Sequence, residues 1–128
     1  MDNTSILNQD DQLCISPDGK HEAKIVGVRE FQMSGPTYGT LILGGQKFDD
    51  GVGVCVCWSE DSKLLAIPKL NASKPEFRIV IIDIDSKAKR YAPGRFGPVG
   101  IKEFSGTKMT LVHLDGDEQL LDVSRIKW

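Results

Sequence analysis

The chain has 128 residues, of which 40% are hydrophobic, and 16 Lys and Arg stand against 18 Asp and Glu. This size is enough for one domain with its own core, without a disulfide framework or a structural metal. The formal net charge of -2 is too small to indicate nucleic acid or an anionic membrane surface as the partner.

Residues 1–12 form a polar, acidic segment that lacks the basic and apolar regions of a secretory signal. We expect a cytoplasmic protein in which this N-terminal segment, with at most a helical turn near Ile6 to Asp11, precedes a single β domain over residues 13–128. The apolar stretches are far shorter than the roughly 20 residues of a membrane-spanning helix. The odd number of cysteines, Cys14, Cys55 and Cys57, favours free thiols in a reducing compartment.

Turn residues then recur along the rest of the chain, at Pro17-Asp18-Gly19, Ser34-Gly35-Pro36, Gly44-Gly45, Asp49-Asp50-Gly51, Pro93-Gly94 and Asp115-Gly116. Turns at this spacing, with β-branched and aliphatic runs between them, are typical of an all-β antiparallel protein. We predict about eight strands, at Ile25–Phe31, Thr40–Leu43, Val52–Trp58, Leu64–Ile67, Phe77–Asp83, Ile101–Phe104, Met109–Leu114 and Gln119–Val123.

Two of these runs show which faces are buried. Side chains alternate along a strand, so in Val52–Trp58 the valines and the tryptophan share the predicted core face, and Gly53, Cys55 and Cys57 share the other. In Phe77–Asp83 nearly every residue is apolar, which predicts a central strand that is covered on both faces. Arg78 is the exception.

A weak repeat relates Cys14–Lys20 to Cys57–Lys63, 43 positions further on, with Cys, Ser, Asp and Lys in common. A third, less similar copy lies at Glu103–Met109, where one residue is missing from the turn. Each repeat unit would contain about four strands. The Ser16–Lys20 and Trp58–Ala66 segments resemble the inter-strand turn of β-propeller blades of the TolB and WD-repeat kind. Propellers close with four to eight blades, and 128 residues at this period give three at most, so we expect two or three blade-like sheets that pack face to face as an antiparallel β-sandwich or an open half-propeller.

No residue pattern indicates an enzyme, a cofactor or a metal. His113 alternates with apolar residues in a predicted strand, and His21 follows a turn, where it is most simply solvated. Cys55 and Cys57 lack the further Cys or His ligands of a zinc site. The glycine-rich run Gly94–Gly100 lacks the Lys-Ser or Lys-Thr of a phosphate-binding loop.

Acidic residues gather at several turns, whereas basic residues concentrate between Lys87 and Arg95. A solvated surface of mixed sign explains any single cluster, but together the clusters would complement a basic partner. A small, acid-decorated β domain without catalytic groups resembles the immunity proteins of polymorphic bacterial toxins, including those of contact-dependent growth inhibition.

That resemblance implies a monomer or weak dimer that covers the active site of a cognate, basic toxin, often a nuclease, without binding nucleic acid or membrane itself. The predicted contact residues are Asp49, Asp50, Glu60, Asp61, Asp115, Asp117 and Glu118, with Tyr38 or Phe96 as an aromatic anchor. Two alternatives are a ligand-binding or enzymatic domain that uses Arg78, His113 and the Cys55 and Cys57 face, and a propeller fragment that dimerises through an edge strand.

Overall fold

A computed structural model describes residues 12–30, 37–53, 56–71 and 76–126. Within these ranges the chain forms eleven strands and no helix, which confirms the predicted all-β class. The described part of the chain therefore has no helix that could span a membrane. The strands are β1 (Gln12–Ile15), β2 (Glu22–Glu30), β3 (Thr37–Leu43), β4 (Gln46–Val52), β5 (Cys57–Trp58), β6 (Leu64–Asn71), β7 (Glu76–Asp83), β8 (Lys89–Tyr91), β9 (Val99–Ser105), β10 (Lys108–His113) and β11 (Glu118–Asp122).

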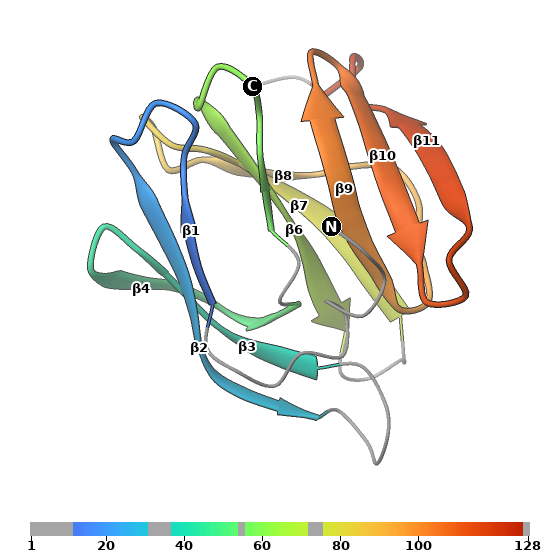
Figure 1. Cartoon of the computed structure of the whole chain (residues 1–128), viewed down its shortest axis with the longest axis horizontal. Helices are drawn as coiled ribbons and strands as arrows, with labels where there is room; N and C mark the ends of the chain where they lie inside the picture. The colour runs from blue at the N-terminus through green and yellow to red at the C-terminus, as the bar shows by residue number, and fades with distance from the viewer. Residues whose placement is uncertain (1–11, 31–36, 54–55, 72–75, 127–128) are drawn as a thin grey trace.

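The strands form three consecutive antiparallel units, here called the first unit (β1–β4), the middle unit (β5–β8) and the third unit (β9–β11). A single residue pair, Val52 with Lys69, joins β4 to β6 and so merges the first two units into one eight-stranded sheet. The third unit is a separate three-stranded sheet. Figure 1 shows the three units side by side in an open arrangement, in agreement with the predicted stack of blade-like sheets.

The middle unit is buried from both sides. On β7, Val80 and Ile82 point into a first core shared with the first unit, whereas Ile79 and Ile81 point into a second core shared with the third unit. A strand covered on both faces needs apolar side chains at successive positions, which explains why this segment does not alternate. The predicted burial of this strand on both faces is confirmed.

The prediction of one continuous strand over Val52–Trp58 is wrong. β4 ends at Val52 and β5 begins at Cys57, because the chain at Gly53 leaves the strand and approaches β6. There the Gly53 amide donates to the Pro68 carbonyl at 2.6 Å, and a Cβ on Gly53 would lie 3.2 Å from the Pro68 Cβ. Val56 and Trp58 are nevertheless buried in the first core, as predicted, while Val54 and Cys55 lie outside the described residues.

Other differences concern strands that are short or rich in charged residues. β1, β8 and most of β4 were not predicted, because their sequences carry charged residues or are too short to show a pattern. β1 and β8 lie at the two edges of the eight-stranded sheet, whereas β4 lies inside it, between β3 and β6. The predicted helical turn near Ile6 to Asp11 and the turn at Ser34-Gly35-Pro36 lie outside the described residues.

The sequence repeat corresponds to two turns with the same hydrogen bonds. Ser16 Oγ donates to Asp18 Oδ1 at 2.6 Å and accepts from the His21 amide; Ser59 Oγ donates to Asp61 Oδ1 at 2.6 Å and accepts from the Leu64 amide. Gly19 and Ser62 occupy the same position, and both have positive φ angles, 74° and 63°. The turn chemistry inferred from the sequence thus builds matching turns in the first two units.

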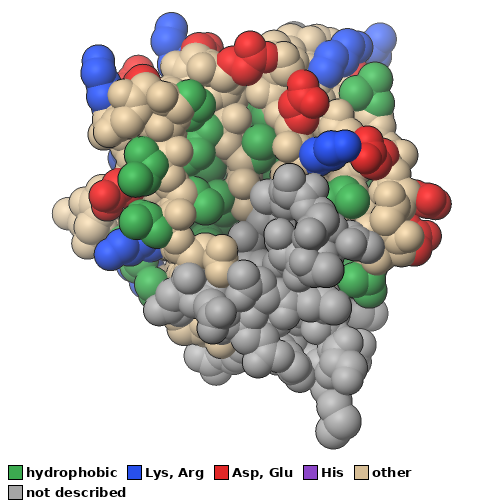
Figure 2. Space-filling model, viewed as in Figure 1, with side chains coloured by type: hydrophobic (Ala, Val, Ile, Leu, Met, Phe, Trp, Pro, Cys, Tyr) green, Lys and Arg blue, Asp and Glu red, His purple; other side chains and the backbone are tan. Residues whose placement is uncertain are grey.

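These turns also connect neighbouring units. Ser62 Oγ accepts a hydrogen bond of 3.0 Å from the Asp18 amide, and Ser105 in the shorter third turn donates to Glu60. The indole of Trp58 donates to the Cys14 carbonyl at 3.3 Å. The three turns lie together at the upper end of the view in Figure 1, where Figure 2 shows charged side chains of both signs.

Candidate binding surfaces

The structure places the predicted acidic contact residues in three separate regions. Asp49 and Asp50 lie on β4, Glu60 and Asp61 in the turn before β6, and the remaining three in the hairpin between β10 and β11. In Figure 1 these elements lie at the left, at the top and at the lower right. The fold therefore does not gather all of these carboxylates on one surface.

The two carboxylates on β4 are neutralised by lysines of the same chain. Asp49 lies 2.5 Å from Lys69 Nζ and 3.2 Å from Lys89 Nζ, and only 12% of its side chain is exposed. Burial raises the pKa of Asp49, but the hydrogen bonds from the two lysines outweigh it, so the pKa is lowered overall. Asp50 pairs with Lys47 at 2.7 Å. Asp49 thus stabilises the fold, whereas the exposed pair of Asp50 with Lys47 contributes little to stability.

The carboxylates in the turn between β5 and β6 hold local structure. Asp61 Oδ1 accepts hydrogen bonds from the Ser59 hydroxyl and from the Lys63 amide, and these bonds lower the pKa of Asp61. Glu60 accepts the hydrogen bond from Ser105 in the third unit. These two side chains connect and shape the turns.

The hairpin between β10 and β11 carries an acidic tip. Asp115 and Asp117 have no Lys or Arg within salt-bridge distance among the residues that the structure describes, whereas Glu118 pairs with Lys102 at 2.8 Å. The Asp117 amide donates to Asp115 Oδ1 at 2.9 Å, and the His113 amide donates to the Asp117 carbonyl at 2.8 Å. These hydrogen bonds shape the tip, and its two aspartates have no cationic partner among the described residues.

Two exposed leucines flank this acidic tip. The exposed fraction is 39% for Leu114, just before the tip, and 66% for Leu120 on β11. Neither leucine was predicted as a contact residue from the sequence. The adjacent pair Leu120-Leu121 indicates an exposed leucine. Side chains of adjacent strand residues point to opposite faces of a sheet, so only one of the two can enter the core. Leu121 packs against the second core.

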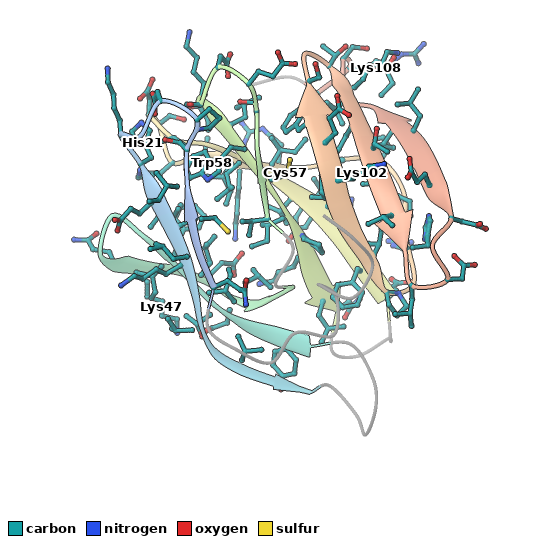
Figure 3. The ribbon with its side chains drawn as sticks, viewed as in Figure 1. His21, Lys47, Cys57, Trp58, Lys102 and Lys108 are labelled. Atoms are coloured by element: carbon teal, nitrogen blue, oxygen red, sulfur yellow. The ribbon has the colours of Figure 1, made fainter. Side chains whose placement is uncertain are left out.

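Leu120 lies on the face of the third unit that is turned away from the second core. On the same face are two cross-strand ion pairs, Lys102 with Glu118 and Lys108 with Asp122, each at 2.8 Å. Figure 3 labels both lysines on the third unit. This face is mainly charged, with one exposed leucine between the pairs.

The two predicted aromatic anchors are half-buried. Tyr38 and Phe96 both pack against the second core. Phe96 also exchanges two backbone hydrogen bonds with Phe77, and its ring lies 6.3 Å from the ring of His113. Phe96 thus contributes to the packing between the middle and third units, whereas Tyr38 reaches the second core from β3 of the first unit.

The residues considered for a ligand-binding or enzymatic site are dispersed. Half-buried His113 on β10 contacts Phe96, and its Nε2 lies 2.9 Å from Gln119 Oε1. Burial and then Glu103 raise the pKa of Cys57 to about 11, which disfavours the reactive thiolate. Cys55 lies outside the described residues. Arg78 on β7 lines two adjacent hollows, and His113 is not among the residues that line either of them.

His21 is not simply solvated. Its ring stacks on Trp58 with a centroid distance of 6.1 Å and an interplanar angle of 22°, and Figure 3 shows the two side chains close together. Both line a hollow of about 360 Å³ between the first and middle units. Trp58 is 9% exposed, and its indole donates a hydrogen bond to the Cys14 carbonyl. We therefore assign the stacking of His21 on Trp58 to packing between the first and middle units.

Across the described residues, no three His, Cys, Asp or Glu side chains come together as a metal site requires. Comparisons of the chain with protein-family models, with curated proteins and with solved structures gave no match.

Proposed function

We propose that this domain works by stoichiometric binding of a basic protein, as an immunity protein that covers the active site of a cognate toxin. One observation carries the proposal. The tip of the hairpin between β10 and β11 holds two carboxylates, Asp115 and Asp117, that lack a cationic partner within the described chain, and exposed leucines stand on either side of them.

This combination suits an interface with a basic protein. Unpaired carboxylates attract lysines and arginines over a distance and orient the partner during encounter. An exposed leucine supplies apolar area that binding can remove from water. Because backbone hydrogen bonds already fix the tip, little conformational entropy is lost when the partner binds. A nuclease toxin uses lysines and arginines to hold the phosphate groups of its substrate. Once these side chains contact the acidic tip, the substrate can no longer bind to them.

The test uses the C-terminal domain of the protein encoded by the gene immediately upstream, coexpressed and then titrated calorimetrically. We expect protection of growth and a one-to-one complex. Asp115→Asn with Asp117→Asn keeps the side-chain oxygen that accepts the Asp117 amide but removes both charges. This double variant should weaken binding about tenfold at low salt and much less at high salt.

The matched control is Glu22→Gln with Asp85→Asn, which removes two exposed carboxylates from other parts of the surface and should leave the affinity unchanged. Equal weakening by the two double variants would refute the hairpin as the contact surface. Absence of both protection and a complex would refute the function.

A further inference from the structure

A groove of about 530 Å³ lies where β8 meets the segment that follows β11. Arg78 and Tyr91 form part of its wall and also line a neighbouring hollow of about 320 Å³, so the two spaces are adjacent. The larger space falls within the range of small-molecule sites, about 300 to 1,000 Å³. The groove joins the middle unit to the third unit and is separate from the acidic hairpin tip.

Arg78 lines both spaces. Its Nε is buried without a hydrogen-bond acceptor among the described residues, and no described carboxylate lies within salt-bridge distance of its guanidinium. The guanidinium stacks over Tyr91, 4.3 Å from the ring centroid, which fixes its orientation. A buried donor without an acceptor is destabilising. An oxyanion in the groove would supply the missing acceptor.

Two further arginines from other segments line the same groove. Arg90 comes from β8 and Arg125 from the segment after β11. The one carboxylate in the wall, Asp122, is already engaged, because it pairs with Lys108 at 2.8 Å and accepts the Ser124 amide. Arginines from three separate parts of the chain thus line one groove, and guanidinium groups are the usual donors to phosphates and carboxylates in proteins.

The rest of the wall is apolar, formed by Ala92, Pro93, Val123 and Ile126. We propose that this groove binds a small organic oxyanion, a phosphate or carboxylate carried on an apolar or aromatic body. The arginines hold the charged group, and the apolar wall removes the body of the ligand from water. The bound oxygen accepts the Arg78 Nε hydrogen that has no acceptor otherwise.

The experiment records amide chemical shifts of the full chain by NMR while four probes are added: phenyl phosphate, benzoate, inorganic phosphate and benzyl alcohol. Phenyl phosphate or benzoate should shift the signals of residues around Tyr91 and Arg125 and saturate. Inorganic phosphate should bind at least about tenfold more weakly because it lacks an apolar body. Benzyl alcohol should cause no saturable shift, and the better of the first two probes identifies the oxyanion.

Arg78→Lys keeps the charge but removes the buried Nε donor, and it should weaken binding about tenfold or more. Arg125→Gln, at an exposed position, should also weaken it and tests the site without altering a strand. The matched control is Arg95→Gln, since Arg95 is exposed, pairs with Glu76 and lies outside the groove wall. Absence of saturable shifts with both organic anions, or equal affinities in all three variants, would overturn the proposal.

This inference is independent of the proposed function. Asp115→Asn with Asp117→Asn should leave binding of the probes unchanged, and Arg78→Lys should leave toxin binding unchanged. Failure of one proposal therefore does not imply failure of the other.

Discussion

Gly39 is a buried position on β3 where the backbone of β2 approaches too closely for a side chain. The register between these strands shifts beyond Val26, and a Cβ on Gly39 would lie 2.8 Å from the Val26 carbonyl oxygen and 2.9 Å from Ile25 Cγ2. Since a real Cβ does not approach a backbone oxygen this closely, the strands would have to separate. The absence of a side chain at this position thus sets the spacing of the first unit.

We predict that Gly39→Ala lowers the free energy of unfolding by about 2 kcal/mol, as expected of overpacking. Gly97→Ala is the control, because nothing lies within 4 Å of a Cβ there and its backbone does not require glycine. It should change stability by less than about 0.5 kcal/mol. Denaturant unfolding measures both, and a cost for Gly97→Ala equal to that of Gly39→Ala would contradict the explanation.

Local residue roles could be predicted from the sequence where the partners are near in the chain. The Ser-Asp turns follow from residues within a few positions of each other, and the structure confirms their shape. The role of Asp49 could not be predicted, because its partners Lys69 and Lys89 lie 20 and 40 positions away. From the sequence, Asp49 is predicted to contact another protein, but in the fold its carboxylate pairs with two lysines of its own chain.

Among the elements, the long apolar strands were predictable, and the strand boundaries near β6 were not. Ala66 on β6 pairs with Cys57 of β5, whereas Lys69 pairs with Val52 of β4. Pro68 lies between these two pairings, and a residue without an amide hydrogen suits the place where a strand changes its neighbour. The sequence of β4 and β5 alone does not contain this information.

The third unit offers a direct comparison between its two faces. Ile101 is fully buried in the second core, and Leu120 on the opposite face is 66% exposed. We predict that Ile101→Ala costs about 2 to 5 kcal/mol of stability, because it leaves a cavity, whereas Leu120→Ala costs less than about 0.5 kcal/mol. Thermal or denaturant unfolding tests this pair. A large loss of stability for Leu120→Ala would show that this face is packed, and would remove the leucine from the proposed interface.

At the scale of the whole molecule, lowered carboxylate pKa values link stability to pH. The pKa of Asp49 is lowered in the fold, so the stability that its ion pairs contribute is complete above the ordinary aspartate pKa of about 4. That contribution is lost as the pH falls through the lower pKa of the folded state. The pKa values of Asp18 and Asp61 are also lowered in the fold, so their contributions to stability are likewise lost at low pH. Raising the pH above neutrality adds nothing to these contributions.

We therefore predict that the free energy of unfolding of the wild-type protein decreases as the pH falls from about 4 toward 2, and that Asp49→Asn makes this decrease shallower. At neutral pH the same substitution should cost about 1 to 3 kcal/mol, because it removes a charged acceptor that lies mostly inside the fold. Urea unfolding at a series of pH values gives both quantities. Parallel curves for the two proteins would show that Asp49 does not carry this dependence.

The charged face of the third unit has a consequence for assembly. Another sheet placed against it would have to strip water from Lys102, Lys108, Glu118 and Asp122, at a cost of several kcal/mol per ion. Repeat proteins protect the ends of their stacks with polar terminal repeats for the same reason. Desolvation of these two ion pairs would therefore disfavour the addition of a further sheet over this face, whereas a partner that contacts only the hairpin tip would leave them in water.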